Sequence, residues 1–383
     1  MKATQTIKSA SLVALSLGVV SSVPAYAEPD DAEPVQRPGE VHDEARDEDG
    51  QQARTPSATA PVSRKPTGRF QIGAGFSSDE SFIATATIAQ DDLFRTGQRL
   101  SMTATISARQ QLFLLGYDVP LGGGLELRTQ LYAKDQLLPG FRRKAAGGTA
   151  SLVAPLGDHL TGFVGFRLEQ VEMTHDGSVP IPETLARTVT SPDQPSTTIA
   201  ALRAGIAYST LDQPFLPTKG RSFGASIELA DPRWGSDVTL ARADVWSSYH
   251  QPLGPAILHL SARGTAVSSR DPGGVPLSER LFLTTSSLVR GYAPGALGPR
   301  EGGTFMYTTR AELEVPLIAS AGISAVGFLD GGGIFDRSGA GSAGTAYGVG
   351  LIWRSPIGPL RFDWGIPLDG GPMRFVFGIG SSF

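Results

Sequence analysis

The stretch Met373-Arg374-Phe375-Val376-Phe377-Gly378-Ile379-Gly380-Ser381-Ser382-Phe383 decides the fold. Its large apolar side chains fall on alternate positions, mostly separated by arginine, glycine or serine. Successive side chains of a β-strand point to opposite faces, so this spacing predicts a strand with one apolar face and one small or polar face. An aromatic residue at the end of such a strand favours a transmembrane β-barrel.

The same period-two alternation extends back to Arg69, in runs separated by clusters of Gly, Pro and Asp. The sixteen predicted strands cover 69–76, 81–90, 98–108, 110–120, 124–133, 143–155, 159–174, 197–211, 221–230, 236–251, 254–268, 303–317, 321–336, 343–354, 358–366 and 372–383. Alternation alone fits a soluble β-sandwich equally well. The even strand number and the secretory signal described below favour an all-β fold, a sixteen-stranded antiparallel transmembrane β-barrel.

Tight turns are predicted at one end of this barrel. A Pro-Leu or Pro-Ile step closes several even-numbered strands, at Pro120-Leu121, Pro155-Leu156, Pro252-Leu253, Pro316-Leu317 and Pro356-Ile357. Proline donates no hydrogen bond to a strand ladder and therefore belongs at strand ends. We expect these short turns on the periplasmic side and the longer loops on the outer side.

Closure of the sheet is a physical requirement in a bilayer, because an unpaired backbone N–H or C=O group in hydrocarbon costs several kcal/mol. The first strand must therefore meet the last. We expect the seam to join residues 69–76 to residues 373–383. The predicted seam residues are Phe70, Ile72, Phe377, Gly378, Gly380 and Phe383.

The N-terminal segment is predicted to lie outside the barrel. A basic start, the apolar run 10–20 and the small residues of Ala25-Tyr26-Ala27 indicate a secretory signal peptide over residues 1–27. Residues 28–66 carry ten acidic and five basic side chains and few apolar ones, which favours a disordered acidic tail in the periplasm. The barrel then occupies residues 67–383.

The composition argues against catalysis and against metal or nucleic-acid binding. The chain has no cysteine, which removes thiolate ligands and thiol nucleophiles. Its five histidines are scattered, and neither an HExxH nor a Gly-x-Ser-x-Gly motif is present. The net charge is −4, so no basic excess favours nucleic acid. We therefore expect no enzyme, no cofactor and no metal site.

The longest gap between predicted strands near the C-terminus holds the candidate site. It surrounds Leu288-Val289-Arg290-Gly291-Tyr292 and would form the sixth outer loop, and loops of such length are usually functional. Three further motifs follow, namely Arg310-Ala311-Glu312-Leu313-Glu314-Val315-Pro316-Leu317, Phe328-Leu329-Asp330-Gly331-Gly332 and Arg354-Ser355-Pro356-Ile357-Gly358-Pro359-Leu360-Arg361-Phe362-Asp363. Their order resembles the C-terminal barrel of the bacterial surface antigen superfamily, which includes the BamA/TamA-type outer-membrane assembly factors.

The resemblance implies that the sixth loop folds into the lumen, where Arg290 pairs with Asp330 on the inner wall. A guanidinium group presents a planar fork that matches a carboxylate. The loop motif comprises Val289, Gly291 and Tyr292. Gly291 would allow a tight turn, and Tyr292 would pack against the wall.

A rival arrangement leaves Arg290 in solvent. Asp330 would then pair with a wall arginine such as Arg310 or Arg361. The sequence leaves both arrangements open.

The resemblance also implies a location in the outer membrane of a Gram-negative bacterium. The implied partners are the lipid bilayer, the machinery that assembles outer-membrane proteins, and client proteins. The implied function is assistance in inserting or translocating proteins there. Relatives that handle clients carry globular periplasmic modules, whereas residues 28–66 are too few and too polar to form one. We expect a short member without such modules, and the alternative is a passive pore or structural barrel that handles no client.

Overall fold

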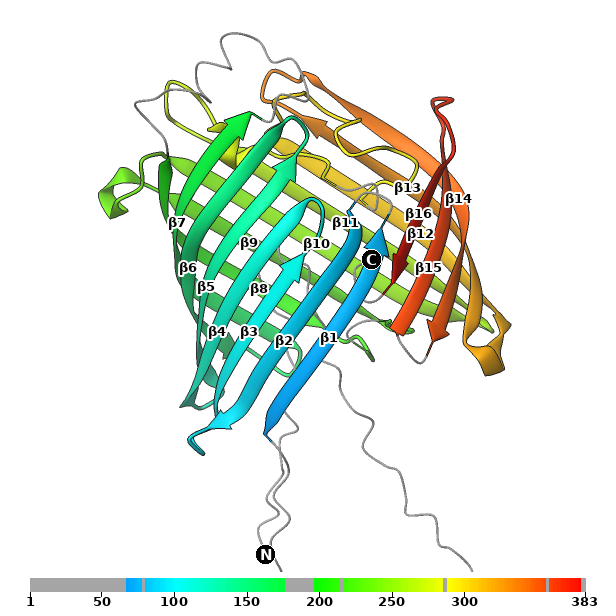
Figure 1. Cartoon of the computed structure of the whole chain (residues 1–383), viewed down its shortest axis with the longest axis horizontal. Coiled ribbons are helices and arrows are strands. Elements are labelled where there is room, and N and C mark those ends of the chain that lie inside the picture. Colours follow the sequence, from blue (N-terminus) through cyan, green and yellow to red (C-terminus); the bar gives the residue numbers. More distant parts are fainter. Residues whose placement is uncertain are drawn as a thin grey trace, which may run out of the picture. The chain divides into compact units, whose positions relative to one another are not determined.

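The computed structural model describes residues 67–77, 80–175, 196–213, 216–284, 288–355 and 358–379. These residues form one antiparallel sheet of sixteen strands, each paired with its neighbour in the chain (Figure 1). The strands are β1 (Gly68–Ser77), β2 (Ser81–Leu93), β3 (Gln98–Ile106), β4 (Gln110–Gly122), β5 (Leu125–Leu138), β6 (Phe141–Pro155), β7 (Leu160–His175), β8 (Thr197–Ser209), β9 (Gly220–Ala230), β10 (Leu240–Leu253), β11 (Ala256–Ser268), β12 (Phe305–Ile318), β13 (Ile323–Phe335), β14 (Gly341–Ser355), β15 (Gly358–Pro367) and β16 (Arg374–Ile379). The predicted fold class and strand number are confirmed.

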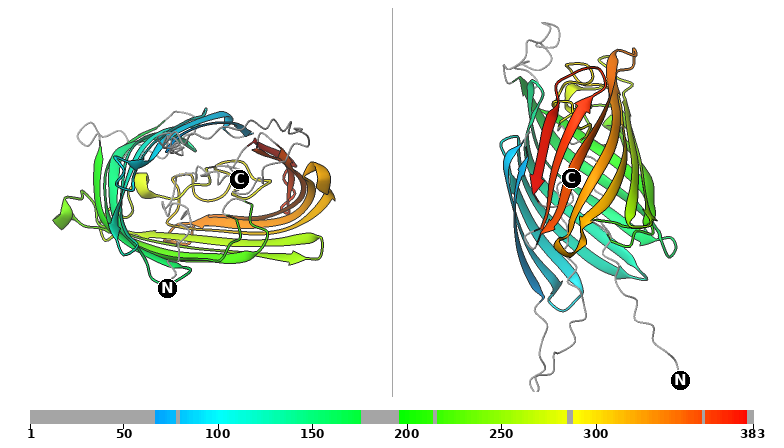
Figure 2. Two further views of the ribbon diagram at one scale, coloured as in Figure 1. Left: turned by 90° about the horizontal axis from the view of Figure 1, so that it is seen from below. Right: turned by 90° about the vertical axis from the view of Figure 1, so that its right-hand side faces the viewer.

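The sheet curls until β1 and β16 lie side by side, so every strand has an outer face and a face toward the lumen (Figure 2). Apolar side chains lie outside and charged ones inside. On β13, Leu329 is 50 % exposed whereas its neighbour Asp330 is 0 % exposed. On β5, Leu131 is exposed and Lys134 is buried. This distribution is that of a barrel whose outer surface faces lipid.

Helices are few in the part of the chain that the structure describes. They are the short 3-10 segments η1 (Pro232–Trp234), η2 (Leu277–Glu279) and η3 (Ala319–Ala321). Among the described residues, no helix has the length and apolar character needed to cross a membrane.

The boundary between β5 and β6 differs from the prediction. The polar residues around Lys134 and Asp135 were expected in a loop, but β5 continues to Leu138 and the turn contains Gly140 at φ 83°. Polar side chains belong on strands here because Lys134 faces the lumen and Asp135 pairs with Arg142 across the turn at 2.7 Å. The polar residues at 134 and 135 therefore belong to the strand and do not indicate a loop.

The start of β10 also differs, because residues 236–239 were expected within the strand and lie before it. Their side chains bind the backbone of β8 and a neighbouring loop instead. Asp237 accepts a hydrogen bond from the Thr198 N–H at 2.6 Å, and the Thr239 hydroxyl donates to Asp271 at 2.6 Å. The Ser236 hydroxyl also donates to the Val238 carbonyl oxygen at 2.8 Å, a local bond of the kind that competes with a strand ladder.

Two of the predicted proline turns coincide with breaks in strand register. The pairing of β4 with β5 shifts between Pro120 and Gly122, and the pairing of β12 with β13 shifts between Pro316 and Ile318. A missing N–H at the strand end explains both irregularities. The Pro356-Ile357 step lies outside the described residues.

The seam between β1 and β16 differs from every other strand junction. Among the described residues, β1 pairs only with β2 and β16 only with β15. The two strands touch through the rings of Phe76 and Phe377, whose centroids are 6.0 Å apart. Of the predicted seam residues, Phe70 and Ile72 lie on β1, whereas Phe377 and Gly378 lie on β16. Gly380 and Phe383 lie outside the described residues.

Fifteen hydrogen-bonded strand pairs hold the sheet together, and from them we expect the folded protein to resist detergent. We expect the unheated protein to migrate faster on a denaturing gel than the boiled protein, because a hydrogen-bonded barrel stays compact in detergent. Gel mobility before and after heating measures this. Equal mobility of the two samples would contradict a barrel held by these ladders.

Candidate functional site

The loop between β11 and β12 carries the candidate site and lies against the inner wall of the barrel. In Figure 2, its yellow trace lies inside the ring of strands. The side chains at the loop tip are buried. Val289 is 1 % exposed and Arg290 is 2 % exposed, values that are unusual for loop residues and especially for an arginine. The wall around them consists of β12, β13, β14 and β15.

Arg290 binds Asp330 of β13 through a two-pronged contact. Its Nε donates to Asp330 Oδ2 at 2.7 Å, and its Nη2 donates to Oδ1 at 2.6 Å. The backbone N–H of Arg290 also donates to Oδ2, at 3.1 Å. The contact therefore fixes both the loop side chain and the loop backbone, and charge-assisted paired bonds of this kind are among the strongest in proteins.

The third guanidinium nitrogen of Arg290 reaches two more carboxylates. Its Nη1 lies 2.6 Å from Glu312 Oε1 on β12 and 3.1 Å from Asp363 Oδ2 on β15. The guanidinium carbon lies 3.5 Å from the centroid of the Phe328 ring, so the cation also stacks on an aromatic face. Arg290 thus ties the loop to three strands at once.

Two wall arginines complete the cluster. Arg361 lies 2.6 Å from Glu312 and 2.7 Å from Asp363, and Arg310 lies 3.5 Å from Asp330. With Arg290, three arginines face three carboxylates, so the charges balance. The arrangement with Arg290 in solvent is not observed, because Arg290 is buried against Asp330. Arg310 contacts Asp330 in addition to Arg290 rather than in its place.

Glu312, Asp363 and Phe328 were not predicted as site residues. Two signals pointed to them, namely their place in the three motifs that follow the loop and the alternation that puts them on inner faces. The missing information was the register, which sets Glu312 opposite Phe328 and brings β15 within reach of the loop. Register depends on pairing between strands and is not contained in the pattern of one strand.

Tyr292 extends the loop contact toward the end of β15. Its hydroxyl donates to Asp369 Oδ2 at 3.0 Å and lies 3.4 Å from the Thr345 carbonyl oxygen. Gly291 has a φ of 98°, a conformation that glycine adopts without strain.

Three wall glycines leave room for the loop tip. A methyl group built on any of them would come within 2.7 Å of a loop atom. The contacts are Gly332 with Val289, Gly344 with Tyr292, and Gly365 with Gly291. The run of glycines on β13 therefore serves close packing at Gly332.

A buried apolar cluster joins the loop tip to the inner faces of β13 and β14. Its buried members are Leu283, Val289, Tyr292, Leu297, Ile334 and Ala346. Ile334 is an apolar residue on the inner face of β13, and it is 2 % exposed beneath the loop. An apolar residue on an inner face is explained by the loop that covers it.

Two histidines and a turn aspartate elsewhere in the barrel make structural contacts. His250 and His259 are cross-strand neighbours whose Nδ1 atoms lie 2.7 Å apart. Asp212, in the turn before β9, accepts hydrogen bonds from Thr218 and Lys219, at 2.6–3.2 Å. Burial would raise the pKa of Asp212, but these bonds outweigh it and lower that pKa. The searched, described residues hold no group of three or more His, Asp or Glu placed to bind a metal.

A sequence profile of the Omp85 superfamily domain matches residues 92–383. Among curated proteins, outer membrane protein assembly factor BamA of Nitratidesulfovibrio vulgaris is 28 % identical over 345 residues, covering 84 % of this chain and 42 % of the relative. BamA of Neisseria meningitidis serogroup B is 23 % identical, covering 84 % of this chain and 48 % of the relative. The chain thus spans less than half the length of these relatives.

Solved structures show the same barrel. BamA from Haemophilus ducreyi lacking POTRA domains 1–3 superposes with a TM-score of 0.73 at 20 % identity, covering 83 % of this chain and 70 % of that one. CdiB from Acinetobacter baumannii superposes with a TM-score of 0.56 at 15 % identity, covering 82 % and 60 %. At these identities the similarity establishes the fold.

Proposed function

The chain belongs to the Omp85 superfamily, and on that basis we propose that it assists the insertion or translocation of other proteins at the outer membrane of a Gram-negative bacterium. Two curated relatives are outer-membrane protein assembly factors by name. Its partners would be the bilayer, client proteins and the machinery that inserts the barrel itself. The N-terminal segment, residues 28–66, would lie in the periplasm.

The seam is the observation that carries this proposal. Fourteen strands have two hydrogen-bonded neighbours, whereas β1 and β16 each have one among the described residues. A strand edge presents a row of unpaired N–H and C=O groups that can template another strand. In hydrocarbon, pairing of those groups is strongly favourable. An incoming client strand would satisfy them, and its own folding would drive the process.

The Arg290 cluster supports this role because of where it lies. It joins the loop to β12, β13 and β15, and β15 pairs with β16. We propose that Arg290 and Asp330 anchor the loop and thereby hold the C-terminal side of the seam in place. The β1 edge, which carries no such anchor in the described residues, is then the side free to move.

A photocrosslinking experiment tests the proposed function. A photoreactive amino acid is placed at Phe76, on β1 beside the seam, and in a separate variant at Leu131, on the outer face of β5. Both side chains are exposed, so the two positions differ in their distance from the seam rather than in accessibility. We expect several-fold more crosslinks to newly exported outer-membrane proteins from position 76.

Equal crosslinking from the two positions, or lipid adducts alone from both, would contradict client handling at the seam. That result would instead favour the passive barrel. Planar-bilayer conductance of the same preparation would then show whether the lumen conducts.

A further inference from the structure

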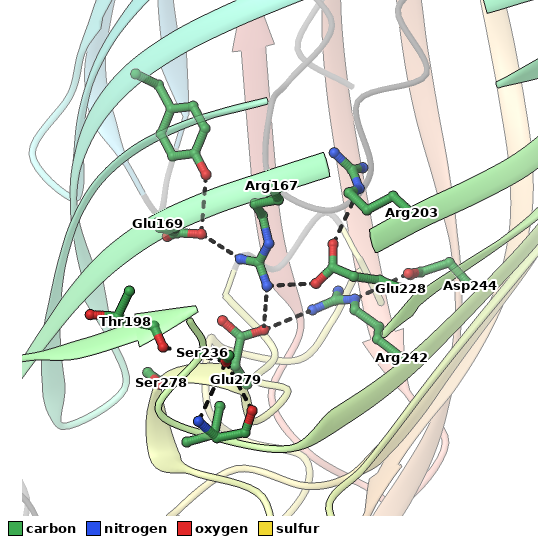
Figure 3. A network of polar contacts seen from close by, with 12 residues as sticks. Arg167, Glu169, Thr198, Arg203, Glu228, Ser236, Arg242, Asp244, Ser278 and Glu279 are labelled. Atoms are coloured by element: carbon green, nitrogen blue, oxygen red, sulfur yellow. Dashed lines mark hydrogen bonds and ion pairs between the residues drawn. The ribbon is translucent and has the colours of Figure 1, made fainter. Parts of the chain in front are cut away.

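A second polar cluster lies on the lumen wall, and Glu279 enters it from the sixth loop (Figure 3). Glu279 ends the short helix η2 and is 4 % exposed. Its Oε1 lies 3.5 Å from Arg143, and its Oε2 lies 3.4 Å from Arg167 and 4.0 Å from Arg242. The loop backbone joins in, because Arg143 Nε donates to the Ser278 carbonyl oxygen at 3.1 Å. A loop carboxylate is therefore surrounded by wall arginines.

The wall around Glu279 has more positive than negative side chains. Its arginines come from β6, β7, β8 and β10, and they are Arg143, Arg167, Arg203 and Arg242. Its carboxylates are Glu169, Glu228 and Asp244. These seven side chains are linked by ion pairs, including Arg143 with Glu169 at 2.7 Å, Arg203 with Glu228 at 3.2 Å and Arg242 with Asp244 at 3.1 Å.

Glu279 reduces this excess of positive charge. Four arginines face three wall carboxylates, and the loop supplies the fourth carboxylate. Arg263, 4.0 Å from Asp244, adds further positive charge at the edge of the cluster. Buried cations without a counter-charge are strongly unfavourable. The wall therefore forms a site for a carboxylate, and the protein's own loop occupies it.

Apolar residues on both sides of Glu279 seal the contact. Val275 and Leu281 belong to the buried cluster on the inner faces of β6 to β11. Phe282 packs on Phe141 of β6, with ring centroids 6.1 Å apart. Exclusion of water strengthens the ion pairs, since charges interact more strongly in a medium of low dielectric constant.

The Glu279 cluster and the Arg290 cluster lie on different parts of the lumen wall. The first draws its residues from β6 to β10 and the second from β12, β13 and β15, so β11 separates their nearest strands. We propose that Glu279 is a second lock, so that the loop is a strap held separately at two parts of the wall. Release of the Glu279 end opens the β6–β10 side of the lumen while the Arg290 end stays docked near the seam.

Single introduced thiols test this inference, because the chain has no cysteine of its own. Ser278→Cys reports on the Glu279 end, since the Ser278 side chain is 9 % exposed and its hydroxyl makes no hydrogen bond. Val289→Cys reports on the Arg290 end, where the side chain is 1 % exposed. Each reporter is combined with Glu279→Ala, with Glu279→Gln and with the control Glu301→Gln. The control removes the same charge from the same loop outside the cluster.

Labelling by a water-soluble maleimide is measured on the full chain in the outer membrane, after heat-modifiable migration confirms that each variant is folded. We expect Glu279→Ala to speed labelling at position 278 by about tenfold or more, because local opening exposes the thiol. Glu279→Gln should have a smaller effect, and Glu301→Gln none. Labelling at position 289 should stay at the parent rate in all three.

Two outcomes would overturn the inference. Unchanged labelling at position 278 in both Glu279 variants would show that Glu279 does not hold the loop. A parallel rise at positions 278 and 289 would show that the loop is released as one body, without a separate second lock. Neither outcome bears on client handling, so this experiment tests the second lock independently of the proposed function.

Discussion

Arg290→Ala is expected to free the tip of the sixth loop from the inner wall, at a cost of about 3–5 kcal/mol in docking free energy, the range found when one partner of a buried ion pair is removed. The substitution leaves Asp330, Glu312 and Asp363 buried with only two wall arginines between them. It also removes the stacking of the guanidinium on Phe328.

Limited proteolysis of intact cells or proteoliposomes measures this effect. Cleavage near Tyr292 should be slow in the parent protein, where that side chain is 7 % exposed, and fast in the variant. Arg290→Lys provides a matched control. It retains the charge but not the planar fork, so it should restore only part of the protection. Parent-like protection in Arg290→Ala would mean that the arginine does not anchor the loop.

The double substitution with Asp330→Ala tests whether the two residues act as a pair. The effects of substitutions within one ion-pair network are not additive. The double variant should therefore lose less docking free energy than the sum of the losses in the two single variants. It should still lose more than either single variant, because Arg290 also binds Glu312 and Asp363 while Asp330 also faces Arg310. If the losses of docking free energy in the two single variants add up to that of the double variant, Asp330 pairs with the wall arginine Arg310 rather than with Arg290.

The sequence was sufficient to predict the sixteen strands, whereas the contact between Arg290 and Asp330 was implied only by the resemblance to a family and stood beside an arrangement with Arg290 in solvent. Alternation shows which face of a strand is apolar, and motif order gives the family. The same alternation placed Glu312 and Asp363 on inner faces, but the residues that meet Arg290 are selected by register and barrel curvature. These are properties of pairing between strands.

Glu279 shows the second limit of sequence analysis. It stands in Leu277-Ser278-Glu279, an unremarked polar turn in the same loop, and its partners come from strands that precede it by up to 136 positions. Nothing local distinguishes it from Glu301, a partly exposed residue of the same loop. Its role is visible only when the loop is seen to cross the lumen, because burial then makes its charge require partners.

Gly365→Ala is expected to weaken loop docking without disturbing the barrel, by about 1–3 kcal/mol, the usual cost of adding a methyl group to a tightly packed site. The added Cβ would lie 2.7 Å from the Gly291 nitrogen and 2.9 Å from the Arg290 carbonyl carbon. Both are backbone atoms, so no side-chain rotation relieves the clash. The loop must move away from β15, and the bond from Arg290 to Asp363 lengthens as it does.

Gly327→Ala on β13 is the matched control for this substitution. A methyl group at Gly327 would meet no atom within 4 Å, so the variant should match the parent in proteolysis and in gel mobility. Gly365→Ala should instead speed cleavage near Tyr292 while the heat-modifiable gel shift persists, because strand pairing of β15 is unaffected. If Gly365→Ala and Gly327→Ala show the same rate of cleavage, Gly365 does not contribute to docking of the loop. If only Gly365→Ala releases the tip, the close approach of loop and wall backbones is itself a condition for the Arg290 contacts.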